Sequence, residues 1–218
     1  RIAYALDCAF QFYYQANLDF LESCPVELVP FSPLKDDRLP ENISGLYLGG
    51  GFPEIYAEQI EQNRPMRQAM KEAVERGLPT YAECGGLIYL SQSVKTLEGN
   101  TYQMAGIIPG EIEMTPKLVN FGYCENEMLG DCFLGRKGDK FRGHEFHYSR
   151  WNAENHSPIH RVKKKRRDDI RVEGYIQGNL LASYVHCHFL SYPKRALCLI
   201  KTAQSFVKTA TASEAQLT

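Results

Sequence analysis

The sequence YAECGGLIYL, residues 81–90, joins an apolar strand pattern to the first turn of a helix and places a cysteine between them. A residue at such a turn lies at the carboxyl end of a parallel strand, where open α/β sheets form their clefts. The small residues Ala82 and Gly86 permit the sharp bend of a nucleophile elbow around Cys84. The partial positive charge at the helix amino terminus favours the thiolate, which is the attacking form. We therefore predict that Cys84 is a catalytic nucleophile; a buried structural cysteine is the alternative.

The segments around this turn alternate between strand and helix patterns. Strand patterns occupy residues 1–6, 26–31, 45–48 and 78–83, and helix patterns occupy residues 13–24, 54–77 with a break near Pro65, and 86–94. This alternation predicts an α/β domain whose parallel sheet is covered by helices on both faces. Shorter, glycine-punctuated strands are expected later in the chain, around residues 103–115, 121–128 and 171–177. We therefore expect a mixed rather than a purely parallel set of strands.

Length and composition indicate one globular domain. The chain has 218 residues, is 44% hydrophobic and carries a formal charge of −1. A chain of this length buries roughly 70% of its unfolded surface and needs no disulfide or metal to fold. The balanced charge disfavours nucleic-acid binding, and no apolar run approaches the ~20 residues of a membrane helix. Seven irregularly spaced cysteines predict free thiols and a cytoplasmic location.

The two ends of the chain and one basic run carry further expectations. A strand pattern begins directly at Arg1, which suggests the carboxy-terminal part of a longer polypeptide. We expect the domain to span residues 1–206 and the small, polar residues 207–218 to form a disordered tail. The basic run at residues 163–167 is followed by two aspartates, and a solvated loop is favoured over a nucleic-acid patch.

A second glycine-rich element follows the strand pattern at residues 45–48, in YLGGGFPE. In a thiol acyl-transfer enzyme, the backbone N–H groups of Gly50, Gly51 and Gly85 would stabilise the oxyanion of a tetrahedral intermediate. A phosphate-binding loop and a plain tight turn are the alternatives. Neither GxxxxGK[ST] nor GxGxxG occurs here, so nucleotide binding by this segment is disfavoured.

A thiol nucleophile needs a base, and four of the six histidines fall in two motifs. These are His144 and His147 in RGHEFHYSRW, and His186 and His188 in ASYVHCHF. In a strand, His186 and His188 face one side and Cys187 the other. The two motifs could together hold a metal, but no carboxylate–histidine metal pattern accompanies them, and we predict none. The remaining two histidines, His156 and His160, are expected in a solvated loop.

The motifs AECGG, YLGGGFPE, RGHEFHYS and SYVH together resemble the glutaminase domain of the cobyrinate a,c-diamide synthase family, over about residues 1 to 200. That family belongs to the class I, or triad-type, glutamine amidotransferases, which have a flavodoxin-like α/β fold. The resemblance implies that Cys84 is the nucleophile and His186 the base, with His188 as the other candidate base. It also implies hydrolysis of L-glutamine to supply ammonia for ATP-dependent amidation of the a and c acetate side chains of cobyrinate, in cobalamin biosynthesis.

The resemblance also implies partners outside this chain. An amino-terminal synthetase domain would bind ATP and Mg²⁺ and give access to the corrinoid acceptor, and no cofactor is expected in this chain; a homodimer is left open. One alternative is a catalytically silent interaction domain of the same fold. Another is the same glutaminase serving a different acceptor, such as nickel-sirohydrochlorin, a cobyric acid precursor or a peptidoglycan precursor.

Two positions depart from the class I pattern. His188 stands where many members carry the glutamate that orients the catalytic histidine, so no third triad member is named. Cys124, in GYCE, stands where relatives usually have an arginine. The candidate accessory residues are His144, Glu145, His147 and His188. Strand alternation places Glu145 and His147 on one face, where they either line the active-site mouth toward the synthetase domain or brace the sheet in a buried network.

Overall fold

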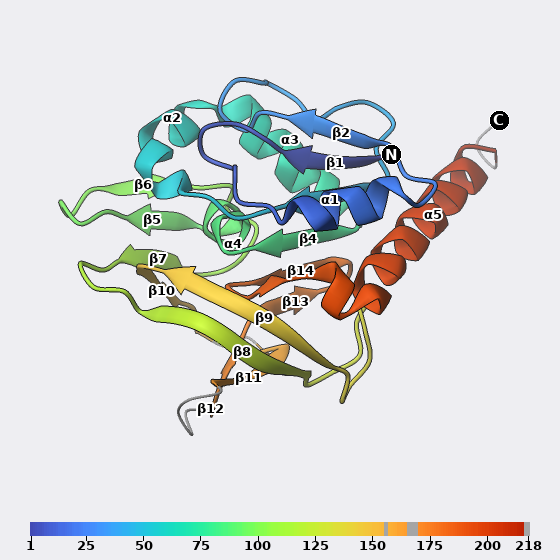
Figure 1. The fold of residues 1–218 in the computed structure, drawn as a ribbon. Coiled ribbons are helices and arrows are strands. Elements are labelled where there is room, and N and C mark those ends of the chain that lie inside the picture. Colours follow the sequence, from blue (N-terminus) through green and yellow to red (C-terminus); the bar gives the residue numbers. More distant parts are fainter. Residues whose placement is uncertain (155–156, 165–169, 216–218) are drawn as a thin grey trace.

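The central sheet is built from six short strands, β1 (Ile2–Ala5), β2 (Leu28–Phe31), β3 (Gly45–Leu48), β4 (Thr80–Glu83), β13 (Tyr175–Gln177) and β14 (Leu180–Ser183). The structure is a computed structural model and describes residues 1–154, 157–164 and 170–215. The strand order is β13-β14-β4-β3-β1-β2 (Figure 1). Strand β13 is antiparallel to β14, and the other five strands are parallel to one another. Without β13 this is the 2-1-3-4-5 order of flavodoxin-like folds, which confirms the predicted fold class.

Helices cover both faces of this sheet because consecutive residues of its central strands β3, β4 and β14 are buried, so both faces must be shielded from water. The helices are α1 (Gln15–Glu22), α2 (Ala57–Gln62), α3 (Arg64–Glu75), α4 (Gly85–Leu90) and α5 (Pro193–Ala215), with 3₁₀ turns η1 (Pro53–Tyr56) and η2 (Phe189–Ser191). Leu48 of β3 packs in one core with Met70 of α3 and Leu87 of α4. Tyr47, the residue before it, packs in a second core with Leu199 of α5. Figure 1 shows α1 and α5 in front of the sheet and α3 behind it.

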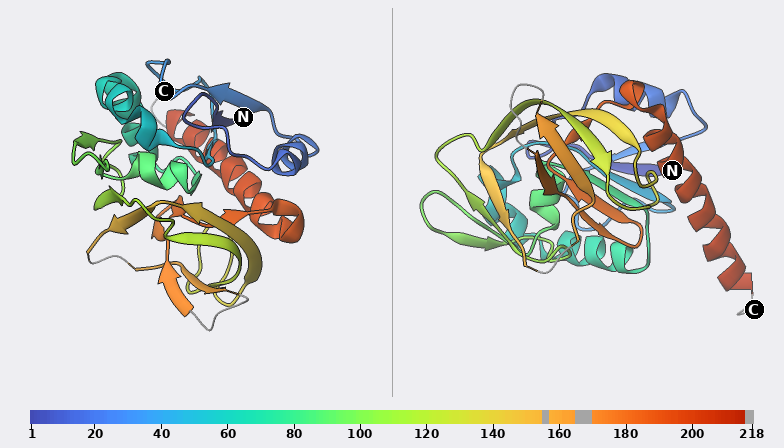
Figure 2. Two further views of the ribbon diagram at one scale, coloured as in Figure 1. Left: turned by 60° about the vertical axis from the view of Figure 1, so that its left-hand side comes forward. Right: turned by 90° about the horizontal axis from the view of Figure 1, so that it is seen from below.

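Two further sheets, one mixed with β5 and β7 parallel and one antiparallel, are built mainly from the chain between α4 and β13. One has β5 (Ser93–Lys95), β6 (Thr101–Gln103), β7 (Glu111–Met114) and β10 (Ser149–Asn152), in the order β10-β7-β5-β6. The other has β8 (Asn120–Met128), β9 (Lys140–His147), β11 (His160–Lys164), β12 (Ile170–Glu173) and, from later in the chain, β15 (His186–Cys187), in the order β12-β11-β8-β9-β15. Figures 1 and 2 show the long strands β8 and β9 beside the parallel sheet. This insertion forms one wall of the site described below.

Two predicted helices differ in their bounds. The helix expected over residues 86–94 ends at Leu90, because Ser91 caps it through its backbone N–H to Leu87 and its hydroxyl to Ile88. Residues 93–95 are instead strand β5, whose Val94 is buried and pairs with β7. The break expected near Pro65 occurs at Asn63, whose side chain caps α3 by accepting from the Met66 N–H; proline in the first turn suits this start.

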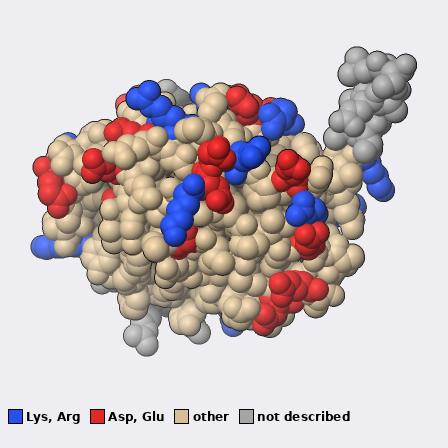
Figure 3. Space-filling model, turned by 90° about the horizontal axis from the view of Figure 1, so that it is seen from above, with Lys and Arg blue, Asp and Glu red and all other residues tan. Residues whose placement is uncertain are grey.

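The end of the chain and its surface complete the fold. Helix α5 runs to Ala215 and so covers residues 207–215, where composition predicts a disordered tail. Of the basic run, Lys163 and Lys164 end β11, and residues 165–167 with the two aspartates at 168 and 169 lie outside the described residues. Basic and acidic side chains are interspersed on the face shown in Figure 3. None of the described helices combines the length and apolar character needed to cross a bilayer.

Candidate active site

Three neighbouring parallel strands end at one place and bring the predicted residues together. Strand β3 leads into the glycines 49–51, β4 into Cys84, and β14 into His186. Cys84 has φ 48° and ψ −96°, in the left-handed region that non-glycine residues rarely adopt. Its N–H donates to the Ser183 carbonyl of β14 at 2.8 Å, and its Sγ lies 3.7 Å from the Phe146 carbonyl of β9. Such a strained turn is typical of a nucleophile elbow.

The glycines after Cys84 allow α4 to begin against backbone. A Cβ on Gly86 would lie 2.5 Å from the Leu48 carbonyl oxygen, and one on Gly85 would lie 2.8 Å from the Gly51 nitrogen. Because both obstacles are backbone atoms, a larger residue would displace the turn. The two loops that follow β3 and β4 therefore touch each other, as the sequence prediction of small elbow residues requires.

The N–H of Gly50 does not serve as the predicted oxyanion donor in this structure. It donates to the Phe12 carbonyl at 3.0 Å, and the Phe12 N–H donates back to Gly50 at 3.1 Å. This pairing fixes the glycine loop and leaves the N–H groups of Gly51 and Gly85 as the remaining candidates. Gly50 instead gives room to the base, since a Cβ there would lie 2.5 Å from Cε1 of His186.

His186 lies at the start of β15 and is buried, with an edge contact to Phe12 at 5.0 Å between ring centroids. Burial lowers its pKa, but its interactions with Cys84 and Glu83 outweigh burial and raise that pKa to about 10. His188 packs instead against Tyr14, with centroids 4.9 Å apart, and both histidines line a pocket of about 380 Å³. Of the two candidate bases, the structure brings His186 to Cys84.

Glu83 is a residue that the sequence analysis missed. It directly precedes Cys84, its side chain is 1% exposed, and its Oε2 lies 3.7 Å from Nδ1 of His186. Its Oε1 accepts from the Tyr81 hydroxyl at 2.6 Å and the Cys187 N–H at 2.9 Å, and its Oε2 accepts from the Tyr47 hydroxyl at 3.1 Å. The available signal was an acidic residue at the end of an otherwise apolar strand.

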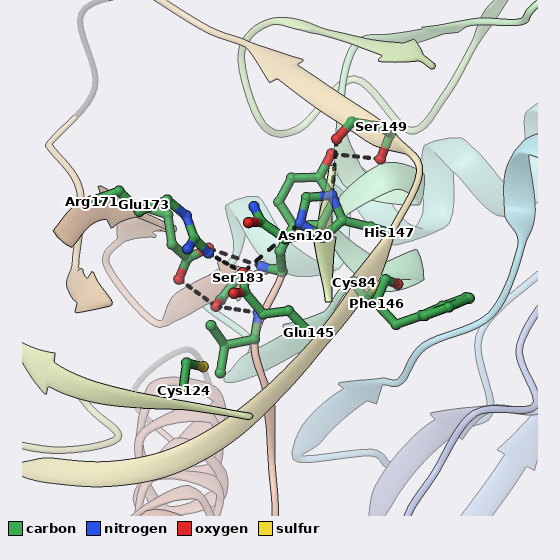
Figure 4. A network of polar contacts seen from close by, with 12 residues as sticks. Cys84, Asn120, Cys124, Glu145, Phe146, His147, Ser149, Arg171, Glu173 and Ser183 are labelled. Carbon is green, nitrogen blue, oxygen red and sulfur yellow. Dashed lines mark hydrogen bonds and ion pairs between the residues drawn. The ribbon is translucent and has the colours of Figure 1, made fainter. Parts of the chain in front are cut away.

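The accessory candidates divide into a buried pair and two partly exposed histidines. Glu145 forms an ion pair with Arg171 and lies 3.9 Å from Nε2 of His147, whose Nδ1 is 2.9 Å from the Ser149 carbonyl (Figure 4). His144, on the opposite face of β9, packs between the exposed rings of Phe121 and Tyr123. The alternation predicted for β9 is present, and the face of Glu145 and His147 is the buried one.

A cavity of about 730 Å³ opens beside Cys84. Its lining includes Gly51 of the glycine loop, Phe146 and His147 of β9, and Glu54 of η1. Among the described residues that line it, the charged side chains are all acidic, namely Glu54, Glu58 and Glu98. The cavity therefore suits a ligand that carries a positive group.

The two histidines expected in a solvated loop lie outside this cavity or outside the described residues. His160 is not solvated; it is buried, 2.9 Å from the Glu173 carboxylate and 2.9 Å from the Arg195 guanidinium, because β11 carries it into the second core. Burial lowers its pKa. His156 lies outside the described residues. Cys124 is buried, and burial raises its pKa to about 12. Across the described part of the chain, no three His, Cys, Asp or Glu side chains are grouped as a metal site would need.

Comparison with known proteins agrees with this geometry. Residues 1–194 match the CobB/CobQ-like glutamine amidotransferase domain. The cobyrinate a,c-diamide synthase of Caldanaerobacter subterraneus subsp. tengcongensis is 45% identical over 206 residues, which are 94% of this chain and 46% of that protein. The synthase of Listeria innocua is 48% identical over 196 residues, 88% of this chain and 43% of that protein. The chain thus spans less than half the length of these relatives.

Solved structures show the same fold at low identity. A glutamine amidotransferase crystal structure superposes with a TM-score of 0.65 at 17% identity, covering 93% of this chain and 98% of that one. PurLQS from Thermotoga maritima gives a TM-score of 0.64 at 14% identity, covering 94% of this chain and 98% of that one. The elbow cysteine, the adjoining glycine loop and the match along most of the chain lead to one assignment: this chain belongs to the family of CobB/CobQ-like glutamine amidotransferase domains.

Proposed function

We propose that this chain hydrolyses L-glutamine as the glutaminase part of a cobyrinate a,c-diamide synthase. The observation that carries the proposal is the convergence of Cys84, in its strained turn beside an acidic cavity, with the buried imidazole of His186. The relatives named above are cobyrinate a,c-diamide synthases, which supports this acceptor over the nickel-sirohydrochlorin, cobyric acid and peptidoglycan alternatives.

The reaction follows from the groups around Cys84. The thiolate attacks the side-chain amide carbon of glutamine, and the N–H groups of Gly51 and Gly85 hold the resulting oxyanion. His186, protonated at neutral pH because its pKa is raised to about 10, donates its proton to the departing ammonia and leaves a thioester on Cys84. The neutral imidazole then takes a proton from water, whose oxygen attacks the thioester and releases glutamate.

The α-ammonium of glutamine requires an acidic partner, and Glu54 supplies it. Its Oε2 is shielded from solvent and has no hydrogen-bond partner in the described structure. Burial raises the pKa of Glu54 to about 7, because in the described structure no cation offsets the cost of burying its negative charge. Burial raises the pKa of Tyr184, and the nearby charges of Cys84 and Glu54 raise it further. The nucleophile and this acid therefore both lie near the Tyr184 hydroxyl group. An ammonium bound in the cavity would pair with this carboxylate.

The ammonia is used for amidation by a synthetase part that we place outside this chain. No phosphate-loop motif occurs in the sequence. We place ATP and Mg²⁺, together with the corrinoid, in the synthetase part of the full-length protein. Phe121 and Tyr123, 61% and 78% exposed beside His144, form an aromatic face for docking that part. The cysteines are free thiols, which fits a reaction in the cytoplasm.

Covalent labelling tests the proposal. A glutamine-like chloroketone should modify Cys84 alone, and excess L-glutamine should protect it, as mass spectrometry of tryptic peptides would show. Cys8, which is exposed, serves as an internal comparison for non-specific alkylation. No modification at Cys84, or equal modification at Cys8, would instead support the catalytically silent interaction domain.

A further inference from the structure

Glu83 is a buried acid that the hydrolysis described above does not use. We propose that Glu83 is the positioning residue for His186, replacing the glutamate that many class I amidotransferases carry two residues beyond the catalytic histidine. That later position is His188 here, which packs on Tyr14. The inference rests on the proposed glutaminase function and names how its base is oriented.

The first step of the argument is geometric. Oε2 of Glu83 lies 3.7 Å from Nδ1 of His186, and both side chains are almost fully buried. A carboxylate at Nδ1 holds the proton on that nitrogen and leaves Nε2 for the thiol of Cys84. The two residues of the pair come from adjoining strand ends, and Glu83 is covalently next to the nucleophile. Orientation of the base and placement of the nucleophile therefore depend on one short segment.

The second step concerns charge. A buried carboxylate is costly unless it is paired, and the other groups that hydrogen-bond Glu83 are neutral hydroxyls and a backbone N–H. Among the described residues, His186 is the one basic group within ion-pair distance of this carboxylate. A protonated His186 compensates the charge of Glu83, and Glu83 in turn stabilises the imidazolium that forms when the thiol gives up its proton.

The third step is that Glu83 is itself fixed in place. Tyr81 and the Cys187 backbone hold Oε1, and Tyr47 holds Oε2 while accepting from Asn17 at 3.3 Å. These partners come from β4, β15, β3 and α1. A carboxylate held directly by three elements, with α1 bracing Tyr47, can keep a histidine ring in one orientation, as a positioning residue must.

Other titratable groups also face His186. Besides Cys84, one is His144 on the paired strand β9, whose pKa is lowered in part by His186. The others line the 380 Å³ pocket together with His186, namely Tyr14, Tyr123, Glu125, Arg142 and His188. Of these groups, Arg142 carries a permanent positive charge, which disfavours an imidazolium. Glu83 offsets this charge, because among the described residues it is the one acid within ion-pair distance of the ring.

The test is the variant Glu83→Gln, compared with two matched controls. Its amide nitrogen, directed at Nδ1, would favour the opposite tautomer of His186, so kcat/KM for glutamine should fall about 10²-fold or more with KM nearly unchanged. Tyr47→Phe removes one of the groups that hold this carboxylate but leaves its charge, so kcat/KM and its pH profile should change less than in Glu83→Gln. Glu173→Gln breaks another buried glutamate–histidine pair, with His160, and should lower stability without changing that profile.

A second measurement does not depend on turnover. In a Cys84→Ser background, the NMR titration of His186 should show that Glu83→Gln lowers its proton affinity about tenfold or more, while Glu83→Asp restores part of it. An unchanged titration and pH profile in a folded Glu83→Gln protein would overturn the inference. If Glu83→Gln fails to fold, Glu83→Asp, which keeps the charge but shortens the side chain, must show a His186 proton affinity below that of the wild type, or the inference is wrong. Failure of Cys84 labelling in the wild type would instead refute the glutaminase function itself.

Discussion

The imidazole ring of His147 lies flat against the phenol ring of Tyr184, with centroids 3.8 Å apart and ring planes 10° from parallel. The Tyr184 hydroxyl is 2.9 Å from Oγ of Ser149, and His147 reaches the Ser149 carbonyl. This buried stack joins β9 to the segment that follows β14. Figure 4 shows His147 near the Glu145–Arg171 ion pair. The structure thus favours the bracing network over a docking surface for this face of β9.

His147→Ala should therefore act mainly on folding. The change removes a stacked ring and a buried hydrogen bond, and the free energy of unfolding should fall by about 2–4 kcal/mol. Glutamine hydrolysis and amidation should decline together in the full-length enzyme. A normal melting temperature with hydrolysis retained and amidation lost would mean that His147 couples the domains instead.

Tyr123 carries the docking prediction. Its ring is 78% exposed in this chain, so Tyr123→Ala should change the stability of the isolated domain by no more than about 0.5 kcal/mol. In the full-length enzyme the same change should leave glutamine hydrolysis intact and reduce the amidation obtained per glutamine consumed. Leu197→Ala, at a residue 50% exposed on α5, is the matched control and should leave that ratio unchanged. If the amidation obtained per glutamine consumed were the same in both variants, the synthetase part would have to dock on another surface.

Gly50 should tolerate no side chain. In Gly50→Ala the new Cβ would lie 2.5 Å from Cε1 of His186 and 3.1 Å from Cβ of Phe12, so the imidazole must move away from its place beside Cys84. We expect a loss of hydrolysis of about 10²-fold or more with the fold retained. Gly130→Ala, which meets only Ile159 at 3.8 Å, should be near neutral. Full activity of Gly50→Ala would contradict the placement of the base.

The His186 pKa also predicts a pH dependence of stability. A histidine whose pKa rises from 6.5 to about 10 on folding stabilises the protein fully below pH 6.5, and this contribution is lost as pH rises toward 10. The difference in melting temperature between wild type and His186→Asn should therefore be largest near pH 6 and should shrink steadily up to pH 10. A difference that stays constant over this range would exclude a charged His186 in the native state.

Local pattern was enough to predict the elbow, the order of strands and helices, and which residues of β9 share a face. It could not predict the role of Glu83, because Glu83 and His186 lie far apart in the sequence and only the packing of the strands brings them together. Nor could it show that Phe12 occupies the Gly50 N–H, or that β11 carries His160 into the core. Alternation assigns residues to opposite faces of a strand, but only the packing of the second sheet shows that the face of Glu145 is buried.

Glu54 provides the test of how glutamine is recognised. If its carboxylate binds the α-ammonium, Glu54→Gln should raise KM for glutamine by about 10- to 100-fold, the worth of a hydrogen bond to a charged group, with little change in kcat. Because burial raises the pKa of Glu54 to about 7, the wild-type KM should also increase as pH falls through 7, and this dependence should vanish in the variant.

A substrate analogue isolates the contact. Glutaramate, which is glutamine without its α-ammonium, should be a poor substrate of the wild type and no poorer for Glu54→Gln, because it has nothing to offer the carboxylate. Glu58→Gln, at another acid lining the same cavity, is the control and should leave both substrates unaffected. If Glu54→Gln impaired glutamine and glutaramate equally, Glu54 would be shaping the cavity wall rather than binding the ammonium, and recognition of that group would have to come from elsewhere in the cavity.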